Sequence, residues 1–152
     1  MSVKNEYLSP CGMYCSVCSV LAAYKNNDQN LKQMLADYFK TEPENIKCEG
    51  CNSRNTFGIV SFCAIKKCAE EKKIDGCHQC NDFVCKNIAE FPIQPARKEM
   101  IESISLRKKL GTEEWVEQVE RHYSCPSCGN QLHRLATICG NCNKPVTFDK
   151  KE

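Results

Sequence analysis

The sequence is poor in histidine and has no marked excess of charge of either sign. Its 152 residues include three histidines, 21 lysines and arginines, and 19 aspartates and glutamates, which gives a formal net charge of +2. With so few histidines, and with no nucleophile-elbow or glycine-rich phosphate-loop motif, the sequence gives little support to a hydrolase or to phosphate-loop chemistry. Because the charge is nearly balanced, electrostatics alone does not indicate binding to nucleic acid or to an anionic membrane.

The sequence also lacks a long hydrophobic run. Its longest uncharged stretch, Tyr7–Tyr24, contains Pro10, Gly12, three cysteines and several serines, and this composition argues against a membrane-spanning helix. The opening stretch Met1–Tyr7 is polar and has no basic region leading into an apolar one, so we expect no signal peptide. These absences predict a soluble cytoplasmic protein that does not associate with membranes.

Nucleic-acid binding is compatible with the C-terminal residues but is not supported by them. Residues 124–152 contain one aromatic side chain, Phe148, whereas single-strand platforms generally combine several aromatics with a basic groove. The charged residues of this stretch are Arg134, Lys144, Lys150 and Lys151 against Asp149 and Glu152. Four thiolates on a zinc ion would add a net charge of −2, which cancels this small excess.

Cysteine is the residue that this sequence has in abundance, with 14 in the chain. Seven disulfides are the simplest alternative to metal binding, but disulfide frameworks belong to secreted chains. The spacing favours metal, because two residues between cysteines let both sulfurs of a tight turn face one ion. The CxxC pairs are Cys15–Cys18, Cys48–Cys51, Cys77–Cys80, Cys125–Cys128 and Cys139–Cys142.

The last two pairs predict a zinc ribbon. Cys125, Cys128, Cys139 and Cys142 form two knuckles separated by ten residues, with Gly129 and Gly140 relieving crowding at the turns. Four cysteines with no open position indicate a structural site, since catalytic zinc keeps a position for water. We expect short strands at Gln131–Leu135 and Val146–Phe148, and we expect His133 between the knuckles not to be a ligand.

Apolar periodicity predicts two helices before residue 92. Asn30–Phe39 carries a helical stripe and can be capped by Asp28 or Asn30, and such a stripe indicates core packing. Ser61–Lys73 forms the second helix, with Gly76 ending the connection that follows it. The stripe of the first helix consists of Leu31, Met34, Leu35, Tyr38 and Phe39.

Two further helices are predicted to connect the cysteine-rich ends of the chain. The prolines of Phe91–Pro95 predict an extended linker, which is followed by a helix over Ala96–Leu110. Gly111 stops this helix, Thr112 caps the next one, and Trp115 is expected to anchor its buried side. The sequence therefore predicts an α+β protein in three parts: a small metal-stabilised Cys-rich helical domain (1–92), a short helical connector (93–123) and a C-terminal zinc ribbon (124–152).

Ten cysteines remain in the N-terminal part, and their order resembles a known family. They fall in the segments Cys11–Cys18, Cys48–Cys51, Cys63–Cys68, Cys77–Cys80 and Asp82–Cys85. This order, over about residues 8–91, resembles a small prokaryotic family catalogued as domain of unknown function 3795. The family commonly reads Phe-Pro-Cys in the last element, where this chain has Val84. The resemblance implies a metal-binding Cys-rich domain and supplies no activity.

Ten cysteines do not divide evenly into sites of four, so their pairing stays open. The preferred grouping joins Cys15 and Cys18 to Cys48 and Cys51. A second site would draw on Cys63, Cys68, Cys77, Cys80 and Cys85, with His78 as an alternative ligand within its turn. Cys11 is the best candidate for a free thiol, which would be reactive beside an ion and inert if buried. With the C-terminal site, this predicts three zinc ions.

Other chemistries of these cysteines are less well supported. Cys11, Cys15 and Cys18 have the spacing of radical S-adenosylmethionine enzymes, but those enzymes need most of an α/β barrel, which this chain is too short to hold. A thiol oxidoreductase needs one activated CxxC rather than five. Iron–sulfur ligation in electron transfer or redox sensing remains the main alternative. The sequence favours a zinc-binding, non-enzymatic interaction or adaptor module with an unidentified protein partner.

Overall fold

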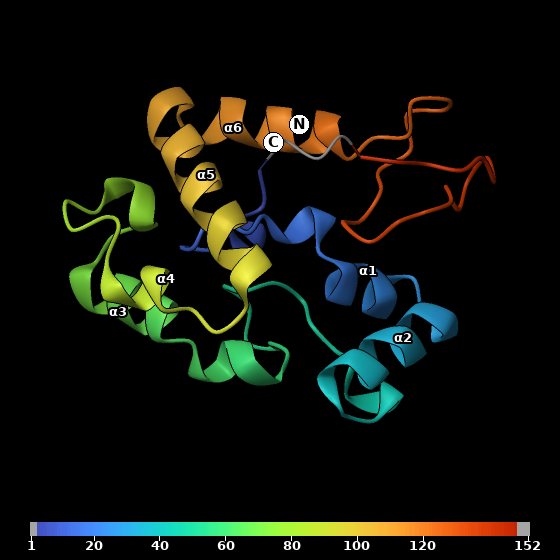
Figure 1. Cartoon of the computed structure of the whole chain (residues 1–152), viewed down its shortest axis with the longest axis horizontal. Coiled ribbons are helices and arrows are strands. Elements are labelled where there is room, and N and C mark those ends of the chain that lie inside the picture. Colours follow the sequence, from blue (N-terminus) through green and yellow to red (C-terminus); the bar gives the residue numbers. More distant parts are fainter. Residues whose placement is uncertain (1–2, 149–152) are drawn as a thin grey trace.

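The computed structural model describes residues 3–148, apart from the side chain of Ile59, and Figure 1 shows that its regular elements are helices. Residues 1–2 of the predicted 1–92 part lie outside the described residues. So do the last four residues of the predicted 124–152 part, Asp149, Lys150, Lys151 and Glu152. The α-helices are α1 (Ser19–Lys25), α2 (Gln29–Phe39), α3 (Ala64–Lys72), α4 (Lys86–Ala89), α5 (Gln94–Leu110) and α6 (Thr112–His122). Short 3₁₀ helices span Asn5–Tyr7, Cys15–Val17, Pro43–Asn45, Gly58–Phe62 and Cys77–Gln79.

The predicted α+β class is wrong, because no β-sheet forms within residues 3–148. The C-terminal segment contains only two isolated antiparallel bridges, Ser124 with Gln131 and Ile138 with Pro145. Pro145 has no N–H with which to extend a ladder. The predicted strand over 131–135 fails for another reason, since its N–H groups are used elsewhere: Arg134 N donates to Val17 O at 2.9 Å and Leu135 N to Ser19 Oγ at 3.3 Å.

Helix α2 forms almost where the sequence predicts it. Asp28 is its cap, and its Oδ1 accepts from Leu31 N at 3.0 Å, which satisfies an N–H of the first turn. The expected core stripe is only partly correct, because Met34 and Tyr38 are exposed. The buried side of α2 consists of Leu31, Leu35 and Ala36, and it packs with Val20 and Ala23 of α1.

The second predicted helix, Ser61–Lys73, divides into two elements. A 3₁₀ helix over Gly58–Phe62 is separated from α3 by Cys63, which is extended with φ −69° and ψ 117°. The residue that ends α3 is Lys73, in the left-handed region at φ 55°. Gly76, predicted to end this connection, is instead extended at φ −178°, so no special glycine conformation is needed there.

Helices α5 and α6 form the predicted pair, with differences at their first residues. Helix α5 begins at Gln94 and takes Pro95 into its first turn, where a missing N–H costs nothing; the linker is therefore shorter than predicted. Gly111, at φ 83°, is the N-cap of α6 in place of Thr112. Trp115 is fully buried and contacts Tyr14 edge to face, with ring centroids 5.6 Å apart. Its predicted role as a core anchor is confirmed.

The helices lie in two groups on either side of the N-terminal segment (Figure 1). Helices α3 and α4 lie beside α5, and Ile65, Ile88, Met100 and Ile104 form their shared core. Helices α1 and α2 lie on the other side, where the segment that follows α6 returns beside α1. Among the described residues, no helix combines the length and the apolar character that crossing a bilayer requires.

Candidate metal centre

The four C-terminal cysteines converge on one point. The sulfurs of Cys125, Cys128, Cys139 and Cys142 all lie within 4.8 Å of one another. The Sγ–Sγ distance is 3.7 Å between Cys125 and Cys142 and 3.6 Å between Cys128 and Cys139. Cys125 and Cys139 are buried and Cys128 is exposed. This is a cluster that could hold a metal ion at the surface of the protein.

Two equivalent turns of the backbone bring these thiols together. Gly129 N donates to Cys125 O at 2.8 Å, and Asn143 N donates to Cys139 O at 2.8 Å. The residue four positions after each first cysteine is left-handed, at φ 77° for Gly129 and φ 60° for Asn143. Glycine and asparagine are the residues that adopt this conformation most readily. The sequence therefore identified the correct glycine in the first knuckle, but in the second this position belongs to Asn143 and not to Gly140.

Polar groups beside Cys128 and Cys139 favour the ionised form of these two sulfurs, whereas burial and the neighbouring thiols raise the pKa of Cys142 despite a backbone hydrogen bond at Lys144. The backbone N–H groups of Cys142 and Asn141 lower the pKa of Cys139 to about 6, against the opposing effect of burial. The side-chain amide of Asn141, whose Nδ2 lies 3.5 Å from Cys128 Sγ, lowers the pKa of Cys128. Because a thiol must lose its proton to bind a metal, these donors prepare the cluster for an ion.

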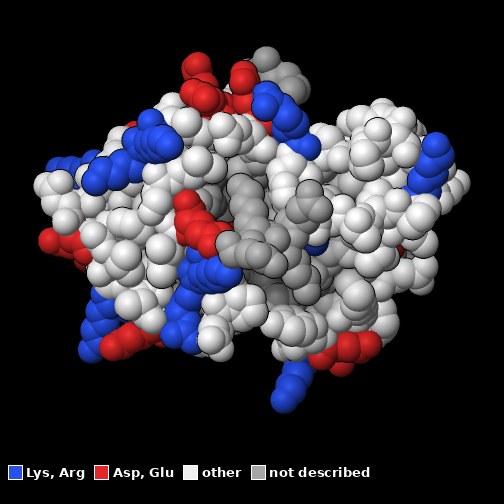
Figure 2. Space-filling view, turned by 45° about the horizontal axis from the view of Figure 1, so that its top comes forward, with Lys and Arg blue, Asp and Glu red and all other residues white. Residues whose placement is uncertain are grey.

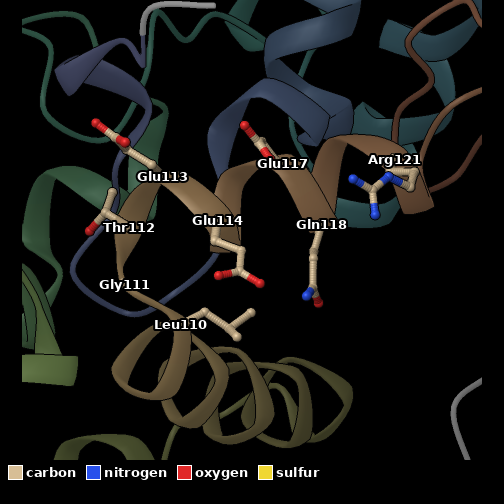
Figure 3. A pocket seen from close by; sticks show the side chains of 8 residues that line it. All are labelled: Leu110, Gly111, Thr112, Glu113, Glu114, Glu117, Gln118 and Arg121. Atoms are coloured by element: carbon tan, nitrogen blue, oxygen red, sulfur yellow. The ribbon is translucent and has the colours of Figure 1, made fainter.

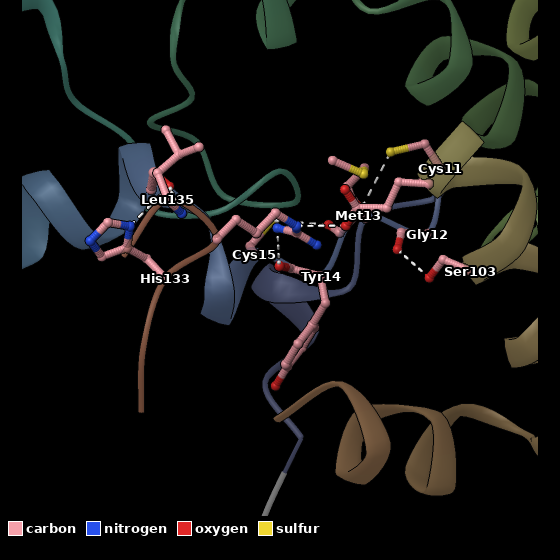
Figure 4. Close-up of polar contacts among 12 residues, drawn as sticks. Cys11, Gly12, Met13, Tyr14, Cys15, Ser103, His133 and Leu135 are labelled. Atoms are coloured by element: carbon pink, nitrogen blue, oxygen red, sulfur yellow. Dashed lines mark hydrogen bonds and ion pairs between the residues drawn. The ribbon is translucent and has the colours of Figure 1, made fainter. Parts of the chain in front are cut away.

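The loop between the two knuckles is anchored to the N-terminal segment. Arg134 Nη1 donates to Tyr14 O at 3.1 Å, and its Nε donates to Glu99 Oε1 of α5 at 2.6 Å. Ser19 Oγ lies 3.1 Å from His133 Nδ1. Figure 4 shows this loop against the segment that carries Cys11 and Cys15. His133 thus contacts a serine of α1 and lies outside the compact thiol cluster.

The structure brings only some of the predicted N-terminal ligands into direct contact. Cys51 N donates to Cys15 Sγ at 3.4 Å. The Cys15 sulfur raises the pKa of Cys51, and Cys48 and Cys11 raise it further, so these thiols lie near one another. Burial raises the pKa of Cys18, and neighbouring Cys15 adds to that effect. The preferred grouping of Cys15, Cys18, Cys48 and Cys51 stays a prediction.

The remaining N-terminal cysteines lie around one apolar core. Cys63, the residue before α3, packs against this core together with Cys11, Cys77 and Cys85. A small cavity beside the core is lined by Cys68, Cys77, Cys80 and Cys85. Within residues 3–148, the C-terminal cluster alone brings three or more potential ligand atoms within 4.8 Å of one another.

A family model described as a protein of unknown function (DUF3795) matches residues 7–90. The chain belongs to this family. The match agrees within one residue at each end with the span 8–91 that the cysteine order predicts, so the resemblance is confirmed for this part. The C-terminal cluster lies outside the matched residues. No curated protein and no solved structure matches the chain.

Within the DUF3795 region, the Cys11 side chain is partly buried. Burial raises its pKa, although hydrogen bonds with Ser9 and Met13 oppose that effect. Ser9 Oγ lies 3.5 Å from Cys11 Sγ. A raised pKa keeps a thiol protonated and poorly nucleophilic. Whether Cys11 is a reactive or an inert free thiol stays a prediction.

A surface hollow lies away from the cysteines, at the turn between α5 and α6. Its volume is about 620 Å³, and Figure 3 shows Glu114 and Gln118 pointing into it from α6. Its lining also includes Glu113, Glu117 and Arg121, with no cysteine or histidine. The residues around this hollow therefore provide neither a nucleophile with a base nor a set of soft metal ligands.

Charges of both signs are interspersed on the face shown in Figure 2, without one continuous basic area. This distribution agrees with the near-neutral composition and gives no support to a nucleic-acid interface. Three cations that lie near cysteines could not be identified from the sequence, namely Lys72, Arg107 and Arg134. Their positions along the chain carry no signal of this role, because they reach the cysteines only through the fold.

Proposed function

We propose that the four C-terminal cysteines bind one zinc ion in a closed structural site, and that this site stabilises a non-enzymatic protein-interaction module. The observation that supports this proposal is the short distance between the thiol sulfurs. Zinc–sulfur bonds of about 2.3 Å in a tetrahedron place the sulfurs about 3.8 Å apart. The Sγ–Sγ distances of 3.7 Å and 3.6 Å are close to that value.

The short distances between the four sulfurs also favour a single zinc ion over an iron–sulfur cluster. In a four-iron cluster each thiolate binds a different iron, so the thiolates are spread more widely than around a single ion. Four sulfurs within 4.8 Å of one another therefore support a mononuclear centre. Thiolates by themselves bind both zinc and iron, and the metal content must decide between them.

The proposed interaction role has support from exposed apolar side chains beside the site. Leu135 and Ile138, in the loop between the knuckles, are each more than half exposed. A metal ion that fixes both ends of this loop would hold the two side chains in place for a protein partner. Large exposed apolar groups held on a rigid loop are typical of contact surfaces.

Metal analysis of anaerobically purified protein tests the metal assignment. We expect zinc, and we expect the Cys128→Ser variant to contain one zinc ion fewer per chain than the unmodified protein. Ser127→Ala, a neighbouring change that removes no thiol, should retain the full complement. Stoichiometric iron with the visible absorption of an iron–thiolate centre would replace zinc with the iron–sulfur alternative.

The interaction role is tested by a variant that keeps the metal and loses the apolar surface. We expect a defined protein partner to bind the unmodified protein and not the Leu135→Ser/Ile138→Ser variant, with equal zinc in both. Met34→Ser, an exposed apolar position on α2, is the matched control and should retain binding. Equal binding by all three proteins would remove this loop from the interface.

A further inference from the structure

Four cysteines from separate elements of the DUF3795 region line a second, smaller cavity. Cys68 comes from α3, Cys77 and Cys80 from the two ends of one short turn, and Cys85 precedes α4. Lys72 and Asn87 also line the cavity, and the rest of the lining is apolar: Ile65, Ala69, Ile74, Phe83 and Ile88. In this arrangement an apolar shell surrounds four soft ligands.

The size of the cavity restricts what can occupy it. Its volume is about 20 Å³, whereas a site for a single water needs about 10–15 Å³ on a comparable measure. A drug-sized organic ligand generally occupies a site of about 300 Å³ or more. The cavity therefore has room for one small ion.

One cation already contacts a sulfur of this cavity. Lys72 Nζ donates to Cys80 Sγ at 3.3 Å and to Asp82 Oδ2 at 2.7 Å. Asp82 holds the ammonium in position, and both partners raise the pKa of Lys72. The Lys72–Asp82 pair therefore places a positive charge in direct contact with one sulfur of the cavity.

A second cation, Arg107 of α5, is buried beside the turn that carries Cys77, and one of its nitrogens has no hydrogen-bond partner. Arg107 is only 2% exposed. Its Nε donates to Thr112 Oγ1 at 3.0 Å and its guanidinium stacks on the Trp115 ring at 5.0 Å, but its Nη1 has no hydrogen-bond partner. No carboxylate within residues 3–148 forms a salt bridge with it.

The unpartnered side of Arg107 lies against the turn that carries Cys77. A Cβ atom built on Gly76 would lie 3.0 Å from Arg107 Nη1, so the absence of a side chain there lets the guanidinium approach. Burial lowers the pKa of Arg107, while the charges of Asp75 and Cys77 raise it. Burying a guanidinium is costly when no carboxylate forms a salt bridge with it. Thiolates around an ion would supply the missing negative charge.

We propose that Cys68, Cys77, Cys80 and Cys85 bind a second metal ion, a soft divalent cation of the zinc class, and that Lys72 and Arg107 balance the charge of this centre. Four thiolates on a divalent ion carry a net charge of −2, and the two cations offset it. The four sulfurs are more widely spaced than those of the C-terminal cluster. Binding one ion would require the four cysteine side chains to turn toward the centre of the cavity.

This proposed centre is distinct from the C-terminal site, and each of the two proposals can be disproved without affecting the other. The experiment counts metal ions per chain by native mass spectrometry on the full-length protein. We expect Cys80→Ser to lose one ion, Cys128→Ser to lose a different one, and the double variant to lose two. Cys63→Ser, which changes a cysteine outside the cavity, should lose neither of these ions. An unchanged count in Cys80→Ser would overturn the proposal, whatever the result for Cys128→Ser.

A measurement on the unmodified protein covers the case in which Cys80→Ser does not fold. Alkylation of the native protein, mapped by peptide mass spectrometry before and after chelation, reports which thiols one ion protects. We expect Cys68, Cys77, Cys80 and Cys85 to become reactive together. Alkylation of these four thiols before chelation, or their exposure at separate stages, would contradict a shared ion.

Replacement of Arg107 tests whether its charge supports metal binding in the cavity. Arg107→Met keeps an apolar stem and removes the charge, so we expect the affinity of this centre for zinc to fall about 10–100-fold, the usual effect of losing a group that supports metal ligands. Lys108→Met, at an exposed position of the same helix, should not change it. The affinity of the C-terminal site should be equal in both variants. Equal zinc affinity of the cavity in both would remove Arg107 from the centre.

Discussion

Arg134 Nε lies 2.6 Å from Glu99 Oε1, and this ion pair joins the loop between the C-terminal knuckles to helix α5. The side chain of Arg134 is 15% exposed and that of Glu99 is 37% exposed. The same guanidinium donates to Tyr14 O. One side chain thus connects the C-terminal segment, α5 and the turn that contains Cys15.

Loss of this guanidinium should loosen the C-terminal segment. We expect Arg134→Met to reduce the free energy of unfolding by about 2 kcal/mol, less than for a fully buried pair because Glu99 is partly exposed. Urea unfolding of the metal-bound protein measures the change. Lys86→Met breaks an exposed pair whose atoms are 3.9 Å apart and should have almost no effect. Equal losses in the two variants would contradict a specific role for Arg134.

The hydroxyl of Ser103 connects the single tryptophan to the N-terminal segment. It accepts from Trp115 Nε1 at 2.9 Å and donates to Gly12 O at 2.7 Å; Figure 4 shows the second contact. We expect Ser103→Ala to cost about 1–3 kcal/mol, because both groups lose a partner in the interior, and to change the tryptophan fluorescence. Ser105→Ala, exposed on the same helix, should leave stability and fluorescence unchanged.

Gly129 and Gly140 should respond differently to the same substitution. A Cβ meets nothing within 4 Å at either position, but Gly129 has φ 77°. Because the left-handed conformation costs an alanine about 1–2 kcal/mol, we expect Gly129→Ala to lower stability by about 1 kcal/mol and Gly140→Ala to have little effect. Thermal unfolding of both metal-bound variants provides the comparison. A larger loss for Gly140→Ala would mean that the second knuckle depends on that glycine after all.

His133 should make part of the stability dependent on pH. Burial lowers the pKa of His133, so the folded protein holds it neutral over a range where the unfolded chain, with a pKa of about 6.5, becomes protonated. Its contribution is therefore present above about pH 6.5 and is lost as the pH falls toward the lower folded pKa. Urea midpoints at about pH 7.5 and about pH 5.5 should differ less for His133→Gln than for the unmodified protein.

Removal of the C-terminal ion should affect tertiary structure more than helix content. Residues 124–148 contain no helix, so Cys128→Ser should leave the far-ultraviolet circular dichroism nearly unchanged. Structural zinc contributes on the order of 10 kcal/mol of apparent binding free energy, and its loss should expose the loop over residues 130–138 to protease. A large loss of helical signal would show that α6 depends on the ion. Ser127→Ala is the control and should resist cleavage.

The sequence by itself determined the features that depend on neighbours along the chain. The two C-terminal CxxC turns, helix α2 with Asp28 as its cap, and the pair α5 and α6 anchored by Trp115 follow from local spacing, capping and periodicity. The DUF3795 resemblance follows from the order of the cysteines. Each of these needs only residues a few positions apart, and local preference therefore predicts them well.

Only the tertiary structure decided the features that join distant parts of the chain. No sheet forms after residue 124, because the N–H groups of Arg134 and Leu135 bond to Val17 and Ser19. The grouping of Cys68, Cys77, Cys80 and Cys85 around one cavity, with Arg107 buried beside it, depends on how α3, α4 and α5 pack. All cysteines offer the same ligand atom, so the sequence cannot tell which of them share an ion; the path of the chain through space decides it.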